Sequence, residues 1–225
     1  MQRHATEALP APDCVAVDED LLVLDKPSGL LCVPGRGEDK QDCLSARAQT
    51  RWPQALIVHR LDMSTSGLVL MALSPAVQRQ LSLAFEQRAI HKRYVAIVHG
   101  LPQPGPQAND GWQTIDAPIA ADWPRRPLRI IDAAGKPSLT RWRVLAHHPP
   151  GWPGCTRVEL EPITGRTHQL RVHLAHLGHP ILGDALYASA GIQALAPRLL
   201  LHAQQLGLSH PRDGVWQEFT LPAPF

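Results

Sequence analysis

The chain has 225 residues, a formal net charge of +2 at pH 7 and 44% hydrophobic residues. This length is sufficient for one large domain or two small ones with a hydrophobic core, and no apolar run approaches the roughly 20 residues of a membrane-spanning helix. The first residues lack the apolar centre of a signal peptide, so we expect a cytoplasmic protein that does not associate with membranes.

Apolar and alternating stretches predict a protein built mainly of strands. Residues 1–12, rich in Ala and Pro, are expected to form a flexible tail before one folded domain over 13–225. The predicted strands are 15–36 (two strands around the turn 25–29), 54–62, 67–73, 92–100, short strands up to about residue 150, 156–162, 197–208 and 216–224. Residues 101–111 contain several Pro and Gly residues and predict a loop.

Helices are predicted over 44–52, 74–88 and 167–178. Ser74 is suited to cap the second helix and Pro75 to occupy its first position. Thr167 is a possible cap of the third helix. Because strands outnumber helices and no regular βαβ series is present, we predict an α+β fold with a largely antiparallel sheet.

Arginine outnumbers lysine 18 to 4, and Arg is the better residue for bidentate phosphate contacts and for stacking on bases. A GC-rich genome, which favours Arg, Ala and Pro codons together, explains the same composition. The four cysteines, Cys14, Cys32, Cys43 and Cys155, form no CxxC pair. They indicate buried free thiols rather than disulfides or a zinc site.

The segment 59–68, HRLDMSTSGL, places charged residues between two apolar stretches. If the residues before the turn form a strand, Arg60 and Asp62 lie on the same face, and the strand ends at a cleft. The alternative is local: Asp62 starts the turn, and its carboxylate accepts the backbone N–H of Ser64 or Thr65. Such a turn does not require Arg60, which favours the first interpretation.

Two further positions are candidate functional residues. Arg166 follows Gly165 in a turn and directly precedes a predicted helix, where a cation is unfavourable for the helix dipole. We therefore expect Arg166 to pair with an anion, either a carboxylate or a phosphate; the alternative is an exposed loop residue. Tyr94 follows Lys92 and Arg93 on a predicted strand, where a core position is the simpler interpretation.

The residues His173, His176 and His179 raise the question of a metal site. On a helix, spacings of three or four can place two ligands on one face. No Cys or carboxylate nearby completes a ligand set, and the sequence has no HExxH motif. We therefore predict no metal site.

Taken together, these segments resemble the RluA-type pseudouridine synthases. HRLDMSTSGLVLMAL, residues 59–73, is similar to the family signature of His-Arg-Leu-Asp followed by Thr-Ser-Gly and an apolar strand. The other matching segments, in chain order, are 18–36, 92–100, 160–188 and 197–208, so the resemblance covers nearly the whole chain. The pieces VPGR, DWPRRP and APRLLLHA most resemble members that act on both a tRNA anticodon-loop uridine and a 23S ribosomal RNA hairpin loop.

The resemblance implies the pseudouridine synthase fold, a central, bent, mostly antiparallel mixed sheet flanked by a few helices around one catalytic cleft. Residues 13–225 would form the catalytic domain, and the N-terminal S4 RNA-binding domain of many relatives is not expected. The implied activity converts specific uridines to pseudouridine in structured RNA. No cofactor, metal or obligatory protein partner is implied, and a monomer is expected.

The resemblance assigns three catalytic residues. Asp62 acts at ribose C1′, either by covalent addition or by removing a ribose proton, and both alternatives stay open. Arg166 is expected to form an ion pair with Asp62. Tyr94 is expected to stack on the uracil and remove the C5 proton, although a phenol with a pKa near ~10 is a weak base and needs local activation.

The target uridine must leave its stack, at a cost of roughly a few kcal/mol, and Arg60 is the candidate to fill the vacated space. Leu170 and Leu200 are expected to pack against the base. The other candidates for RNA contact are His59, Arg36, Arg125 and Arg126, for which ordinary surface charge is the alternative.

Three rival functions remain at this level. A single-substrate synthase would modify only tRNA or only rRNA. A nucleosidase would cleave the same bond with water, but it needs a second acid or base that these motifs do not offer. A non-catalytic RNA-binding protein on the same scaffold would tolerate loss of the Asp62 carboxylate.

Overall fold

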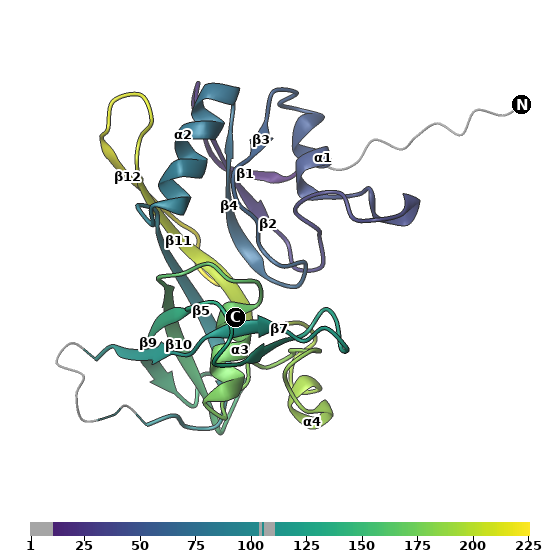
Figure 1. Cartoon of the computed structure of the whole chain (residues 1–225), viewed down its shortest axis with the longest axis vertical. Coiled ribbons are helices and arrows are strands. Elements are labelled where there is room, and N and C mark those ends of the chain that lie inside the picture. The colour runs from purple at the N-terminus through teal and green to yellow at the C-terminus, as the bar shows by residue number, and fades with distance from the viewer. Residues whose placement is uncertain (1–10, 104, 106–110) are drawn as a thin grey trace, which may run out of the picture.

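A computed structural model describes residues 11–103, 105 and 111–225 (Figure 1). Residues 1–10 of the predicted tail, and residues 104 and 106–110 of the predicted loop, lie outside the described residues. Within these bounds, no helix has the length and apolar character needed to cross a lipid bilayer.

Strands dominate the described chain, as the sequence predicts. The strands are β1 (Asp13–Val17), β2 (Leu21–Lys26), β3 (Leu56–Ile57), β4 (Ser66–Ala72), β5 (His91–His99), β6 (Gln113–Asp116), β7 (Ile119–Ala121), β8 (Arg129–Ile131), β9 (Leu139–His147), β10 (Cys155–Pro162), β11 (Leu201–Ser209) and β12 (Trp216–Thr220). The helices are α1 (Leu44–Gln49), α2 (Pro75–Glu86), α3 (Gln169–His176) and α4 (Ala190–Gln193), with a 3₁₀ turn η1 (Glu38–Lys40).

One ten-stranded sheet organises the molecule. Its strands follow the order β1-β2-β4-β11-β5-β10-β9-β6, with β3 attached to β4 and β12 to β11, while β7 and β8 form a separate pair. Among the named strands of the described chain, β4 and β11 form the one parallel pair, and the other pairs are antiparallel. The predicted α+β class with a mostly antiparallel mixed sheet is confirmed.

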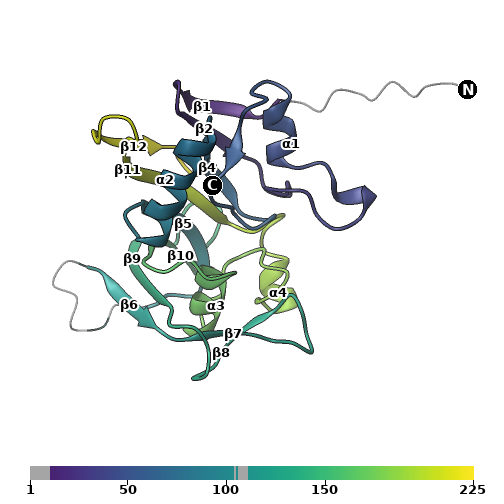
Figure 2. The same ribbon diagram turned by 45° about the horizontal axis from the view of Figure 1, so that its top comes forward.

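The sheet joins two halves of the molecule. Figures 1 and 2 show β1 to β4 with α1 and α2 in one half, and β9, β10, α3 and α4 in the other, connected through β5 and β11. Strand β4 is buried along its whole length. Its Val69 and Met71 pack into a core with α1, whereas Leu68 and Leu70 pack on the opposite face with α2, which is the alternation expected of a strand covered on both faces.

The N-terminal caps of the helices are partly as predicted. Ser74 caps α2, its hydroxyl accepting the N–H of Val77 at 3.3 Å, and Pro75 is the first helical residue. Thr167 does not cap α3, so this prediction is wrong. His168 precedes the helix instead, in a left-handed conformation with φ 58° and without a side-chain cap.

The predicted strands over 15–36 are only partly correct, because both strands form before the turn 25–29. The connection between β1 and β2 is made by Asp18, whose carboxylate accepts the N–H groups of Asp20 and Leu21 at 2.8 and 2.7 Å. This is the local hydrogen bonding that favours Asp in turns. Beyond the turn, the segment forms only an isolated bridge, between Leu31 and Cys43.

The strand predicted over 54–62 is much shorter in the structure, where only Leu56–Ile57 are in β3. The ladder with β4 ends where the N–H of Leu70 donates to His59 Nε2, at 2.9 Å, instead of to a backbone carbonyl. Residues 58–65 are consequently a loop, and Arg60 and Asp62 do not lie on a strand.

Gly67 marks the parallel pairing at the centre of the sheet, where it lies opposite Ala203. Its φ is 109°, and a Cβ built there would lie 2.3 Å from the Ala203 carbonyl oxygen. A side chain at this position therefore conflicts with both the backbone conformation and the neighbouring strand.

We expect Gly67→Ala to lower the free energy of unfolding by about 2–4 kcal/mol, because it combines backbone strain with a backbone clash. Gly191→Ala in α4 is the control, since a Cβ there meets no atom within 4 Å. Denaturant unfolding of the two variants measures the difference; equal stabilities would contradict this role of Gly67.

Candidate active site

The loop between β3 and β4 carries Asp62 into a cavity. The loop closes with a backbone hydrogen bond from the Thr65 N–H to the Asp62 carbonyl oxygen at 3.1 Å. In the described chain, no backbone N–H donates to the Asp62 carboxylate, so the local-turn interpretation of this side chain is wrong. The Asp62 side chain is 25% exposed and is free to act in the cavity.

The turn at residues 25–29 fixes the backbone of this loop through hydrogen bonds. Lys26 is fully buried, and its Nζ donates to the carbonyl oxygens of Pro27, Leu30 and Met63 at 2.8, 2.8 and 2.9 Å. The N–H of Gly29 also donates to the Met63 carbonyl, at 2.8 Å. The residue directly after Asp62 is thus held by two donors from the turn 25–29.

Arg171 is the cation that faces Asp62. Its Nη1 lies 3.4 Å from Asp62 Oδ2, while its Nε and Nη2 form a bidentate pair with Asp184 at 2.8 and 2.7 Å. The side chains of Arg171 and Asp184 are 4% and 0% exposed. Burial lowers the pKa of Arg171, but the hydrogen bonds and charge of Asp184, with the charge of Asp62, raise it above its usual value. A permanent positive charge therefore stands beside the Asp62 carboxylate.

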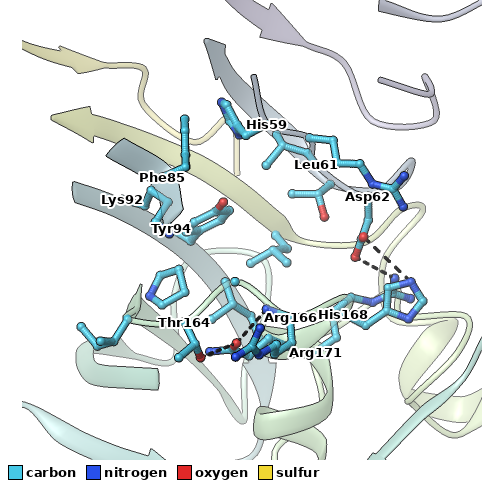
Figure 3. Close-up of a pocket in the computed structure, with 18 of the residues that line it drawn as sticks. His59, Leu61, Asp62, Phe85, Lys92, Tyr94, Thr164, Arg166, His168 and Arg171 are labelled. Atoms are coloured by element: carbon cyan, nitrogen blue, oxygen red, sulfur yellow. Dashed lines mark hydrogen bonds and ion pairs between the residues drawn. The ribbon is translucent and has the colours of Figure 1, made fainter. Parts of the chain in front are cut away.

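The second neighbour of Asp62 is His168, the residue before α3. Its Nε2 lies 3.9 Å from Asp62 Oδ1, and its Nδ1 is hydrogen-bonded to the Tyr187 hydroxyl at 2.7 Å. Burial lowers the pKa of His168 in spite of the nearby Asp62 charge. At neutral pH, the charge facing Asp62 therefore comes from Arg171 and not from His168 (Figure 3).

The predicted Asp62–Arg166 ion pair is wrong. Arg166 lies in the turn before α3, and its Nε donates to the Pro137 carbonyl at 3.3 Å. Its backbone N–H donates to Gln169 Oε1 at 3.0 Å, which holds the turn. Arg171 lies five residues further on, on the buried side of α3, and forms the contact with Asp62 that we expected of Arg166.

Tyr94 lies on β5 and lines the same cavity as Asp62 and Arg166, as expected. The alternation of the strand places Lys92 on the same side, and Lys92 also lines the cavity. Burial raises the pKa of the Tyr94 phenol, and the Asp62 charge raises it further. The phenol is therefore protonated at neutral pH, and the activation that a general base needs is absent from the free protein.

The other predicted base-binding residues fall into two groups. Arg60 and Leu170 line the cavity, and Arg60 is exposed at its rim. Leu200 is buried in the core away from the cavity, and the adjacent Leu201 lines it instead, so the expected contact of Leu200 with the base is not supported.

His59 lines the cavity, but its contacts indicate a structural role. Its Nε2 accepts the Leu70 N–H, and its ring stacks on Phe85 with centroids 4.5 Å apart. Burial, with a smaller effect of the Lys92 charge, lowers the pKa of His59 to about 3. His59 is thus neutral, and its acceptor nitrogen is occupied by the backbone.

Three predicted RNA contacts lie outside this cavity. Arg36 is exposed in the loop before η1. Arg125 pairs with Asp122, with Nε 2.7 Å from Oδ2. The Arg126 guanidinium carbon lies 3.5 Å from the centroid of the Trp123 ring.

The histidine spacing on α3 does not create a metal site. Both ring nitrogens of His173 form hydrogen bonds, Nδ1 with Thr140 Oγ1 at 2.9 Å and Nε2 with the Ala117 carbonyl at 3.0 Å. Within the described ranges, no three His, Cys, Asp or Glu side chains are close enough together to bind a metal ion.

The cavity has a volume of about 520 Å³ and is formed by both halves of the molecule. Figure 3 shows Asp62 on one wall, opposite His168 and Arg171. Leu61, Phe85 and Leu201 add apolar surface. A pocket of this size with a few convergent polar groups is typical of a small-molecule or nucleotide site. The cavity therefore presents a partly exposed carboxylate and apolar walls to a bound group of about nucleotide size.

Comparison with known proteins gives the family. Residues 20–176 match the family model for RNA pseudouridylate synthase. A relative from Escherichia coli (strain K12), the dual-specificity RNA pseudouridine synthase RluA, is 47% identical over 209 residues, which are 92% of this chain and 91% of the relative. RluA from Pasteurella multocida (strain Pm70) is 43% identical over 217 residues, 96% of this chain and 95% of the relative. The chain therefore belongs to the RNA pseudouridylate synthase family of RNA-modifying isomerases.

Solved structures support the same assignment. Human RNA pseudouridylate synthase domain containing 1 aligns with a TM-score of 0.79 and 31% identity, covering 100% of this chain and 87% of the human chain. Human RNA pseudouridylate synthase domain containing 4 aligns with a TM-score of 0.73 and 26% identity, covering 94% and 88%. The predicted pseudouridine synthase fold is thus confirmed.

We expect Arg171→Ala to lower the free energy of unfolding by about 3–5 kcal/mol, because it leaves Asp184 buried without its partner. Arg166→Ala is the matched control and is expected to change stability by less than about 0.5 kcal/mol. Urea unfolding measures both values. A larger loss for Arg166→Ala would contradict the exchange of roles between the two arginines.

Proposed function

We propose that this pseudouridine synthase has dual specificity and modifies a tRNA anticodon-loop uridine and a hairpin-loop uridine of 23S ribosomal RNA. The observation that carries the proposal is the 47% identity, over 91% of its length, to a relative named as a dual-specificity RNA pseudouridine synthase. The alternative is a synthase with only one of these substrates.

Asp62 is the proposed catalytic carboxylate. Pseudouridine formation breaks the bond between ribose C1′ and uracil N1 and joins C1′ to C5, so an anion near C1′ stabilises the electron-poor sugar, as it does in glycoside hydrolysis. The proton lost from C5 is balanced by one gained at N1, and the product has the mass of the substrate. Support comes from the contact with Arg171, whose Nη1 lies 3.4 Å from Asp62 Oδ2 in the cavity. Covalent addition and ribose-proton removal both use this carboxylate.

Tyr94 is proposed to stack on the uracil and to take the C5 proton. The raised pKa of the phenol has burial as its first cause and the Asp62 charge as its second. Removal of the C5 proton follows formation of the C1′–C5 bond, when Asp62 is no longer bonded to C1′. Loss of the Asp62 charge therefore does not supply the activation that Tyr94 needs.

Arg60 is proposed to occupy the stack position that the flipped uridine leaves. The guanidinium is planar and stacks on bases, and Arg60 lies exposed at the rim of the cavity. In the described part of the chain, the Arg60 guanidinium forms no hydrogen bond or ion pair with a carboxylate or carbonyl that would have to break first.

We further propose a cytoplasmic monomer. The proposed catalytic groups Asp62 and Tyr94, with Arg171, come together within a single chain. The cysteines are free thiols, as expected in a reducing compartment, and tRNA and ribosomal RNA are used in the cytoplasm.

The substrates are tested by mapping pseudouridine in cellular RNA with and without the gene. We expect loss of pseudouridine at one tRNA anticodon-loop uridine and at one 23S ribosomal RNA uridine, and re-expression should restore both. Loss at only one of the two RNAs would establish the single-substrate alternative.

Asp62→Asn is expected to lower kcat by at least about 10³-fold while RNA affinity is retained, because the amide keeps the shape but not the charge. Asp213→Asn, in the exposed turn before β12, is the control. Release of tritium from [5-³H]uridine RNA measures turnover. Normal turnover by the Asp62 variant would contradict the catalytic role proposed for Asp62.

Tyr94→Phe is expected to lower kcat by about 10²–10⁴-fold, the usual effect of removing a general base, with little change in RNA affinity because the ring still stacks. The measurement is single-turnover kinetics, with the enzyme in excess over the RNA and at a concentration that saturates it. If the phenylalanine variant reacts at the wild-type rate, Tyr94 acts only by stacking.

A further inference from the structure

A second cavity lies next to the active site. Its volume is about 510 Å³, and its walls come from the β7–β8 pair, the turn after it, and the turn before α3. Gly165 and Arg166 line both cavities. Strand β8 packs against α3, and Figure 2 shows β7 and β8 beside that helix. A chain that enters the active site therefore passes close to this second cavity.

An exposed aromatic side chain, Trp123, lies at the edge of this cavity. Trp123 lines it and is 68% exposed, the largest value among the exposed apolar residues of the described chain. Arg126 lies over the Trp123 ring, with its guanidinium carbon 3.5 Å from the centroid. The pair presents flat surfaces, indole and guanidinium, both of which stack on nucleic-acid bases.

The cavity is also rich in cations that lack an anionic partner. Arg129, Lys136 and Arg166 line it, and in the described part of the chain none of them pairs with a carboxylate. Asp122, next to Trp123, binds Arg125, with Nε 2.7 Å from Oδ2, and Asp132 Oδ1 accepts the N–H of Ala134 at 2.8 Å. A cluster of this kind attracts a phosphate.

Arg129 adds a second, independent observation. Its Nε is buried and has no hydrogen-bond partner among the described residues. Buried donors without a partner are rare and need an explanation, which binding of a phosphate by this guanidinium would supply. The backbone N–H of Arg129 is used, since it donates to the Tyr187 hydroxyl at 3.0 Å.

We propose that this second cavity binds another nucleotide of the RNA whose target uridine enters the active site. The base stacks on the Trp123–Arg126 pair, and Arg129 and Lys136 bind phosphate oxygens. Arg166, on the shared wall, binds the phosphate between the two nucleotides. This inference rests on the proposed function. It gives Arg166 an RNA phosphate as its anionic partner, in place of the Asp62 carboxylate that we expected from the sequence.

A site that holds a neighbouring nucleotide contributes to recognition more than to chemistry. Loss of one base–aromatic stack weakens binding by about 5- to 100-fold. Trp123→Ala is therefore expected to raise the KM and the Kd for RNA by about tenfold, with kcat almost unchanged. Arg126→Gln and Arg129→Gln are expected to raise both constants as well, and their effects should shrink as salt is raised.

The experiment uses the full chain and a short stem-loop RNA copied from the modified site that mapping identifies. Trp216→Ala is the matched control, because Trp216 is 47% exposed on β12 and lines neither cavity. Fluorescence anisotropy gives the Kd, and initial rates give KM and kcat separately. Thermal melting checks that each variant is folded, and Arg126→Gln replaces Trp123→Ala if the latter is not.

Cross-linking gives a direct readout. With 5-iodouridine placed at each loop position in turn, one non-target position should cross-link to a peptide that contains Trp123. The same RNA affinity in wild type, Trp123→Ala and Arg129→Gln would overturn the second nucleotide site. A wild-type protein that binds the stem-loop but does not modify it would instead contradict the proposed substrates.

Discussion

The active site depends on one buried guanidinium that serves two carboxylates. Arg171 is fixed by its bidentate pair with Asp184, which in turn accepts the N–H groups of Leu186 and Tyr187 at 2.9 and 3.1 Å. The remaining nitrogen, Nη1, is left to face Asp62. Buried ion pairs contribute little net stability after their desolvation. The value of this arrangement therefore lies in the fixed positive charge that it places beside Asp62.

The two anchors of Asp62 come from opposite halves of the molecule. Lys26 holds the Met63 carbonyl from the N-terminal half, and Arg171 contacts the carboxylate from the C-terminal half. The parallel pairing of β4 with β11 joins these halves directly behind the loop. The cavity at Asp62 is thus a consequence of the sheet topology, because the fold brings residues 26, 62 and 171 together.

Local features were predictable from the sequence, and long-range partners were not. The cap at Ser74 and the strand of Tyr94 depend on nearby residues, whereas the prediction that Asp62 and Tyr94 line one cavity came from the family resemblance. The Asp62–Arg171 contact joins residues 109 positions apart, and no local pattern in the sequence encodes it. The available signal was Arg171 itself, a charge flanked by Leu170 and Val172, which predicts a buried and therefore paired cation.

The most direct test of this account is a double-mutant cycle on kcat with Asp184→Asn and Arg171→Lys. If Asp184 acts on the reaction only by holding Arg171 against Asp62, the double variant should be hardly slower than the slower single variant, with a coupling energy of about 1–3 kcal/mol. Additive losses would show that the two residues act independently and would contradict the central role given to their pairing.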